Sequence, residues 1–245
     1  MPSPTLITLT DAGLYCAAGD FHIDPWRPVQ RAVVTHAHAD HARPGSRSYL
    51  AARDGEHVLR ARMGMHASIQ PADYDAPVEI NGVRVSLHPA GHILGSAQVR
   101  VEYRGEVWVV SGDYKVGADA TCAAFEPVRC NSFITESTFG LPVYRWRPQV
   151  EIFDEINAWW RANQLAGKAS LLFAYALGKS QRLLAGVDPS IGPIFTHGAV
   201  ERLVGEYRAS GVALPATTYA AAGRKAEWSQ ALVVAPPSAL GTPWM

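Results

Sequence analysis

The feature that most constrains this chain is a short apolar strand that runs directly into a cluster of metal-binding side chains. The stretch THAHADHAR, residues 35–43, places three of the nine histidines and one aspartate within six positions. The four side chains are those of His36, His38, Asp40 and His41, and burying them this close together without a metal ion would be costly. The spacing H-x-H-x-D-H therefore predicts a metal site on a loop that follows a strand at residues 31–35.

A loop at this point separates the cluster into two pairs. His36 and His38 can converge on one metal ion while Asp40 and His41 turn towards a second, because a loop is not bound by the strict alternation of side chains along a strand. Neutral imidazole and carboxylate are ligands that suit Zn²⁺ and also Mn²⁺. The pattern favours two divalent metal ions, Zn²⁺ first and Mn²⁺ as the alternative.

Two later segments offer the further ligands that two metal ions need. His92 lies in the glycine-flanked stretch PAGHILGSAQ, and Asp113 ends an apolar strand in VVSGDYK. Other histidines stand apart from any such cluster, and we expect His57, His66 and His197 to be ordinary core or surface side chains.

The hydrophobic pattern divides the chain near Gly140. Residues 1–140 are predicted to be antiparallel and rich in hairpins, with turns at the Asn-Gly pair 81–82 and the Arg-Gly pair 104–105, and with SFITEST as a buried strand. Residues 141–245 alternate strands with helices, beginning with the helical stretch RPQVEIFDEINAWWRANQLAGK. We therefore expect an α/β (α+β) fold in two domains.

Bulk composition indicates the compartment of the protein but does not identify its substrate. Basic and acidic residues balance at 22 each, which gives no support to nucleic-acid binding. Arginine supplies 18 of the 22 basic residues and is the better bidentate phosphate ligand, although a GC-rich genome would produce the same bias. Three cysteines outside any C-x-x-C spacing favour a reducing compartment. Without a signal peptide or a long apolar run, we expect a cytoplasmic protein with no membrane segment.

Four motifs together point to a known family. THAHADH resembles the signature of the metallo-β-lactamase fold, while AGHILGSAQ, SGDYK and TESTFG resemble the β-CASP nucleases, which process nucleic acids. Within them the chain is most similar to the bacterial ligase-associated DNA exonucleases, which GDFHIDPWRPV and ALGKSQRLL also fit. The resemblance extends over essentially the whole chain. It implies a metallo-β-lactamase αββα sandwich over residues 1–140 and a β-CASP-like α/β cap over residues 141–245.

The resemblance also implies a role for each candidate residue. The first metal ion would be held by His36, His38 and His92, the second by Asp40 and His41, and Asp113 would bridge the two. Asp24 would orient a ligand histidine by a hydrogen bond. Glu136 would open the cap region and support a metal-site or acid histidine. Asp40, Asp113 and Glu136 are the implied catalytic carboxylates, and the reaction would be phosphodiester hydrolysis by a metal-activated hydroxide.

Three further residues are candidate contacts for a substrate phosphate. Lys115 lies two residues beyond Asp113, and a solvated surface lysine explains it equally well. Lys179 and Ser180 open a helix after a strand in ALGKSQ, where backbone N–H groups favour an anion. ATP binding is rejected, because the Walker A pattern needs a glycine where this chain has Phe173.

The resemblance implies a longer chain than this one. The family continues past VVAPPSALGTPW into a segment with a further histidine, which supports the second metal ion and is a candidate general acid. This sequence ends at Met245 and has no histidine after His197. We expect a fragment or a natural truncation that lacks the C-terminal return of the sandwich, with a second metal group short of one ligand.

Several functions remain open at this stage. The first is a metal-dependent DNA exonuclease acting on single-stranded DNA or DNA ends in repair, with a DNA ligase and a helicase as partners implied by the family. The second is a ribonuclease of the same superfamily that processes RNA. A catalytically incomplete metal-binding scaffold is a third, and a hydrolase of small thioesters or lactams is a weaker fourth, since the cap-like second half suits a polymer better.

Overall fold

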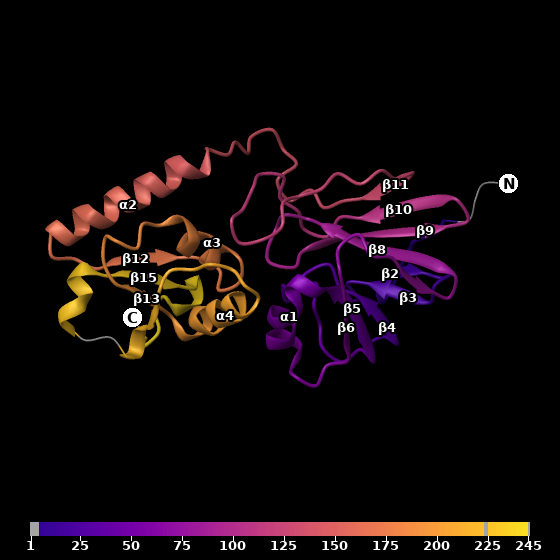
Figure 1. The fold of residues 1–245 in the computed structure, drawn as a ribbon, viewed down its shortest axis with the longest axis horizontal. Helices are drawn as coiled ribbons and strands as arrows, with labels where there is room; N and C mark the ends of the chain where they lie inside the picture. The colour runs from indigo at the N-terminus through magenta and orange to yellow at the C-terminus, as the bar shows by residue number, and fades with distance from the viewer. Residues whose placement is uncertain (1–4, 223–224, 245) are drawn as a thin grey trace. The chain divides into compact units, whose positions relative to one another are not determined.

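The computed structural model describes residues 5–222 and 225–244, and the chain divides into two compact units, Met1–Thr138 and Phe139–Met245 (Figure 1). Each unit has a hydrophobic core of its own. The two units are therefore described one at a time.

The first unit contains a six-stranded sheet whose strands follow one another in chain order. Its strands are β1 (Thr8–Thr10), β2 (Gly13–Cys16), β3 (Phe21–Ile23), β4 (Arg31–Val33), β5 (Ser48–Ala52) and β6 (Ile69–Ala72). The first three pair antiparallel, and β3 to β6 pair parallel. The expectation of an antiparallel first part is thus wrong for three of the five strand pairs of this sheet. Parallel neighbours need long crossovers, and the one between β5 and β6 contains α1 (Glu56–Met63).

The second sheet of this unit is the hairpin-rich part. It has the order β11-β10-β9-β8-β7, with β7 (Val78–Ile80), β8 (Val83–Pro89), β9 (Ala97–Tyr103), β10 (Glu106–Val110) and β11 (Ser132–Ile134). Both predicted hairpin turns are confirmed. Asn81 and Gly82 have φ of 50° and 78°, and Arg104 and Gly105 have 51° and 82°, the positive values that a tight two-residue turn requires.

One strand of this sheet differs from its prediction. SFITEST was expected to be a buried strand, but β11 covers only Ser132–Ile134 and is partly exposed. It pairs with β10 alone, in parallel, at the edge of the sheet, and Phe133 is 44% exposed. An edge position leaves one side of a strand open to solvent, so an apolar sequence alone does not guarantee burial.

The two sheets enclose one hydrophobic core between them. Phe21, Ile23 and Val33 from the first sheet belong to the same buried cluster as Val85 and Val99 from the second. Because successive side chains of a strand alternate, one face of each sheet supplies this core. Among residues 5–138, α1 is the one α-helix, so these residues supply both sheets of the expected sandwich and a single helix.

The second unit is built around a parallel sheet with the order β12-β15-β13-β14. Its elements are α2 (Gln149–Leu165), β12 (Ser170–Phe173), α3 (Lys179–Gly186), β13 (Ile194–Thr196), α4 (Gly198–Ala209), β14 (Thr218–Tyr219) and β15 (Leu232–Ala235). Short 3₁₀ helices lie at Ala220–Ala222, Lys225–Gln230 and Pro237–Ala239, and a fourth, Arg53–Gly55, precedes α1 in the first unit. The alternation of strands and helices that the sequence predicts is present.

The helices of this unit share one face of the sheet. Trp160 of α2, Leu184 of α3 and Val204 of α4 pack in one cluster with Leu232 and Val234 of the central strand. The intervening Val233 belongs to a separate cluster on the opposite face. Within the described residues, no helix is long and apolar enough to cross a bilayer.

Candidate metal centre

Three loops of the first unit bring the predicted ligands together. The first follows β4, the second joins β8 to β9, and the third follows β10. The second and third loops leave the sheet at the same ends of neighbouring strands. Pro89, at the end of β8, pairs with Ala97 at the start of β9, and Val110, at the end of β10, pairs with Val99. The amide of Ala97 donates to the carbonyl of Thr35 at 2.8 Å, and this hydrogen bond connects the start of β9 with the loop after β4.

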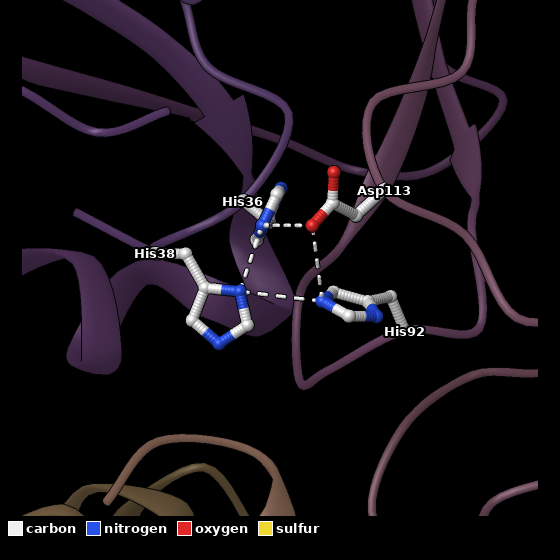
Figure 2. A group of neighbouring side chains, drawn as sticks. All are labelled: His36, His38, His92 and Asp113. Carbon is white, nitrogen blue, oxygen red and sulfur yellow. Dashed lines mark hydrogen bonds and ion pairs between the residues drawn. The ribbon is translucent and has the colours of Figure 1, made fainter. Parts of the chain in front are cut away.

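One ligand group consists of three histidines and an aspartate whose side chains point towards one another (Figure 2). His36 Nε2 lies 3.0 Å from His38 Nδ1, which lies 3.2 Å from His92 Nε2. Asp113 Oδ2 lies 3.7 Å from His36 Nε2 and 3.5 Å from His92 Nε2. All four ligand-type atoms lie within 4.8 Å of one another. The residues expected to hold the first metal ion therefore converge, joined by the expected bridging aspartate.

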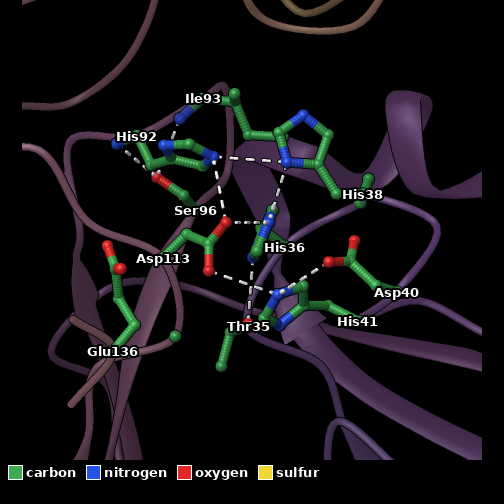
Figure 3. A network of polar contacts seen from close by, with 12 residues as sticks. Thr35, His36, His38, Asp40, His41, His92, Ile93, Ser96, Asp113 and Glu136 are labelled. Carbon is green, nitrogen blue, oxygen red and sulfur yellow. Dashed lines mark hydrogen bonds and ion pairs between the residues drawn. The ribbon is translucent and has the colours of Figure 1, made fainter. Parts of the chain in front are cut away.

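Asp113 also faces the second predicted pair. Its other oxygen, Oδ1, lies 3.2 Å from His41 Nε2, and this nitrogen lies 3.7 Å from Asp40 Oδ2 (Figure 3). One carboxylate thus presents one oxygen to each group of ligands. This is the arrangement that a bridging aspartate requires.

Hydrogen bonds to the Nδ1 atoms of His36 and His41 fix the orientation of these two imidazoles. His41 Nδ1 lies 2.7 Å from Asp24 Oδ2, which also accepts from the Thr35 hydroxyl at 2.6 Å. The Thr35 hydroxyl in turn lies 3.1 Å from His36 Nδ1. With a proton on each Nδ1, His36 and a neutral His41 would present the lone pair of Nε2 to a metal ion beside Asp113. Partners of this kind commonly fix the tautomer of metal-ligating histidines.

The two histidines on either side of Asp113 differ in their affinity for a proton. Burial lowers the pKa of His36 well below its usual range, and the nearby histidines lower it further. Burial also acts to lower the pKa of His41, but its hydrogen bonds to Asp113 and Asp24 outweigh this and raise the pKa to about 10. The hydrogen bond from His41 lowers the pKa of Asp113. The metal-free centre therefore combines a neutral His36, a charged His41 and an ionised Asp113 at neutral pH.

Two glycines allow the ligand loops to approach this closely. Gly112 has a φ of 55°, and a Cβ at this position would lie 2.6 Å from the Thr35 side chain. Gly91 has a φ of 71°, and its Cβ would lie 2.3 Å from the carbonyl oxygen of Lys115. Any larger residue would push the loops of Asp113 and His92 away from their neighbours.

Sequence reasoning missed two residues that hold the ligands in place. Thr35 is 1% exposed and connects Asp24 with His36, as described above. Ser96 is 2% exposed, and its Oγ accepts from the backbone N–H groups of His92 at 3.0 Å and Ile93 at 3.2 Å. Their positions beside the motif histidines were the available signal, but hydroxyl side chains are too common in loops for this signal to stand out.

Four predicted residues lie outside this network or are engaged elsewhere. Glu136 accepts from the backbone N–H of Thr138 at 2.8 Å, and Figure 3 shows no interaction between it and the ligands. The Lys115 ammonium donates to backbone carbonyls of its own loop. Lys179 is exposed and lies over the ring of Tyr175. Ser180 is fully buried, and its hydroxyl donates to the Tyr175 carbonyl at 2.8 Å.

A second group of ligand-type side chains lies apart from this centre. Asp75, His88 and Glu126 also bring one ligand atom each within 4.8 Å of the others. Both ring nitrogens of His88 have protein partners, Nδ1 at 2.6 Å from Asp75 and Nε2 at 2.9 Å from Ser86. In the group of His36, His38, His92 and Asp113, by contrast, three imidazole nitrogens face one another. A shared cation is the simplest way to satisfy all three nitrogens.

The donor set fits a divalent metal ion of the zinc type. Imidazole nitrogens and carboxylate oxygens are the usual ligands of Zn²⁺ in sites of this composition. Three imidazole nitrogens that face one another at hydrogen-bond distance cannot all be satisfied by a single proton between them. His36, His38, His92 and Asp113 therefore have the chemistry and the convergence that a metal ion needs.

Comparisons of the sequence with known proteins find similarity to two kinds of enzyme. No family model matches the chain. The chain is 29% identical over 206 residues to a probable DNA ligase of Opitutus terrae, covering 83% of this chain and 20% of the ligase. It is 30% identical over 122 residues to the endoribonuclease YSH1 of Saccharomyces cerevisiae, covering 49% of this chain and 15% of that protein. The chain thus spans a fifth or less of the length of these relatives.

A solved structure has the same fold at low sequence identity. It is a protein of unknown function from Enterococcus faecalis V583, with a TM-score of 0.55 and 10% identity over 84% of this chain and 58% of that chain. The fold is metallo-β-lactamase-like. The expected mixed α+β class is confirmed, with two sheets around one core in the first unit and a parallel sheet covered by helices in the second.

Proposed function

We propose that this chain acts as a metal-dependent phosphodiesterase that degrades DNA from single-stranded ends, in DNA repair. The observation that carries the proposal is the position of Asp113, whose two oxygens face two separate groups of ligand side chains. Two-metal sites of this kind are typical of enzymes that hydrolyse phosphate esters. The similarity to a probable DNA ligase supports DNA as the substrate and a ligase as a functional partner.

The proposed ligands divide as the motif predicts. His36, His38 and His92 would hold one ion, Asp40 and His41 the other, and Asp113 both. Bound divalent ions of this type lower the pKa of a coordinated water and neutralise charge on phosphate oxygens. Zinc is the favoured ion because most of the donors are imidazole nitrogens, and manganese is the alternative.

The chain's own residues prepare this site in three ways. The low pKa of His36 keeps its Nε2 free of a proton at neutral pH. Asp24 holds the His41 ring at 2.7 Å with its Nε2 facing Asp113. The ionised Asp113 supplies negative charge between the two groups, where positive charge is to be bound. Glu136 and Lys115 remain candidates for supporting the site and contacting a phosphate.

We divide the fold by role as well. Residues 1–140 would form the metal-binding domain and residues 141–245 a β-CASP-like cap that contacts the polymer. The second unit, a parallel sheet with helices, supports this division because its alternation of strands and helices is that expected of the cap.

Degradation of matched DNA and RNA oligonucleotides, with Zn²⁺ or Mn²⁺ supplied, tests the proposal. We expect DNA to be shortened from an end, giving a ladder of products, and Asp113→Ala to be inactive. Preference for RNA, or a single internal cut, would replace this proposal by an RNA-processing endonuclease. That second candidate is favoured by the similarity to the yeast endoribonuclease over half of this chain.

Metal content separates an enzyme from a binding scaffold. Mass spectrometry of the intact chain is expected to show two ions per chain alongside turnover. One ion or none, with no turnover on either nucleic acid, would indicate a metal-binding role without catalysis.

A further inference from the structure

Three aromatic side chains at the start of the second unit are unusually exposed. Phe139, Tyr144 and Trp146 are 53%, 45% and 72% exposed. They lie in a segment without helix or strand that leads into α2. Aromatic rings normally contribute their large apolar surface to a core, and a group of exposed rings marks an interaction site.

The three rings are arranged as two walls and a floor. Tyr144 and Trp146 lie nearly parallel, at 9°, with centroids 6.5 Å apart. Phe139 lies nearly perpendicular to both, at 83° and 88°, with its centroid 5.0 Å from each. A flat base stacked on two faces needs about 6.8 Å between them, twice the ~3.4 Å spacing of stacked bases. The 6.5 Å between the centroids of the two nearly parallel rings is close to this value.

The aromatic segment also contains an arginine that can contact an anionic polymer. Arg145 lies between the two walls in sequence, is exposed, and makes no hydrogen bond or ion pair with any other described residue. Arg147 is instead held by Glu151 and Glu155 of α2. Aromatic cages also bind quaternary ammonium groups, but an unpaired arginine in the same segment disfavours a cation and attracts a phosphate.

We propose that the aromatic slot of Phe139, Tyr144 and Trp146 binds one unstacked base of a single-stranded nucleic acid, with Arg145 contacting the adjoining phosphate. The nucleic-acid identity of the ligand rests on the proposed function. Stacking on aromatic side chains tolerates any base, because every base has a π face, so the slot would recognise single strands without reading their sequence. In a duplex the bases are already stacked and are not available to it.

Binding of a fluorescent single-stranded oligonucleotide with phosphorothioate linkages, which resist cleavage, tests the slot on the full chain with Zn²⁺ supplied. The comparison strand is the same oligonucleotide with abasic sites, which keeps the phosphates and removes the bases. We expect the normal strand to bind more tightly by about 5- to 150-fold, the range for stacking one base. Trp146→Ala should abolish this preference, and Trp146→Phe should retain most of it.

Two further variants separate stacking from general damage to the fold. Trp159→Ala removes another partly exposed tryptophan, on α2, and should leave the preference unchanged. Arg145→Gln should weaken the binding of normal and abasic strands alike and lower the slope of log affinity against log salt by about 0.7. Equal affinity of the wild-type chain for normal and abasic strands would overturn the proposal. So would a preference that survives in Trp146→Ala, or one that tetramethylammonium abolishes by competition.

A separate hydrolysis assay keeps this test distinct from the proposed function. Hydrolysis of ordinary DNA with no preference for bases over abasic sites would reject the slot and leave the nuclease intact. Base-dependent binding without hydrolysis under any metal would support the slot and reject the nuclease.

Discussion

The Nδ1 atom of His41 lies 2.7 Å from the Oδ2 atom of Asp24, on the side of the ring that faces away from Asp113. This contact makes Asp24 the residue that decides which nitrogen of His41 is available to a metal ion. Asp24 comes from the loop after β3, and a positive φ of 45° turns it towards the loop after β4. The second metal group therefore depends on a residue that is not itself a ligand.

Asp24→Asn is expected to weaken binding of the second metal ion, the one assigned to Asp40 and His41, and to affect the first ion little. An asparagine amide that donates to His41 Nδ1 places the ring proton on Nε2, where a metal would bind. Loss of such a supporting partner typically costs about 10- to 100-fold in metal affinity or activity. A calorimetric titration with the metal ion should show this loss of affinity for the second equivalent and little change for the first. An unchanged second equivalent would show that Asp24 does not control the tautomer of His41.

Binding of the second metal ion should release a proton at neutral pH, because His41 is one of its proposed ligands. In the metal-free chain the pKa of His41 is raised to about 10, so its ring is protonated at pH 7.5 and a metal must displace that proton. The pKa of His36 is lowered, so its ring is already neutral. Affinity for the second ion should therefore rise by about tenfold per pH unit up to the pKa of His41.

Calorimetry in two buffers of different ionisation enthalpy measures this release directly. We expect release of about one proton with the second equivalent at pH 7.5. Release of a proton with the first equivalent only would contradict the assignment of His41 to the second group.

Gly112→Ala should destabilise the chain and disturb the ligand loops. A methyl group at this position would lie 2.6 Å from Thr35, in a backbone conformation that already disfavours L residues. Gly105→Ala is the matched control, because Gly105 also has a positive φ of 82° but no atom lies within 4 Å of the added carbon. We expect the control to lose about 1–2 kcal/mol of unfolding free energy and Gly112→Ala to lose more. Equal losses in urea denaturation would mean that the approach of Thr35 is not tight.

The sequence predicted local structure best where one residue type has a strong conformational preference. The Asn-Gly turn at 81–82 and the alternating strands on either side of it were predicted correctly, because turn chemistry and alternation act over a few residues. The parallel pairing of β3 to β6 was not, since it depends on which distant strands meet. The prediction that Ser132–Ile134 is buried was wrong for the same reason, because an edge position is a property of the whole sheet.

The candidate site shows a similar division between motif and context. His36, His38, His92 and Asp113 were found from their residue types and neighbours, and the structure brings them together. Thr35 and Ser96 were missed, because their contribution depends on distances that sequence spacing does not encode. The burial of the Ser180 hydroxyl was likewise decided by tertiary packing, after a local pattern had suggested an anion site.

If Asp113 is shared by two metal sites of a phosphodiesterase, its removal should stop hydrolysis, which is measured on a DNA oligonucleotide with Asp113→Ala beside the wild-type chain. Removing the shared carboxylate takes one ligand from each group, so the account predicts a rate at least about 100-fold below that of the wild-type chain with Zn²⁺ or Mn²⁺ supplied. A wild-type chain that hydrolyses DNA and an Asp113→Ala variant that does so at the same rate would contradict it.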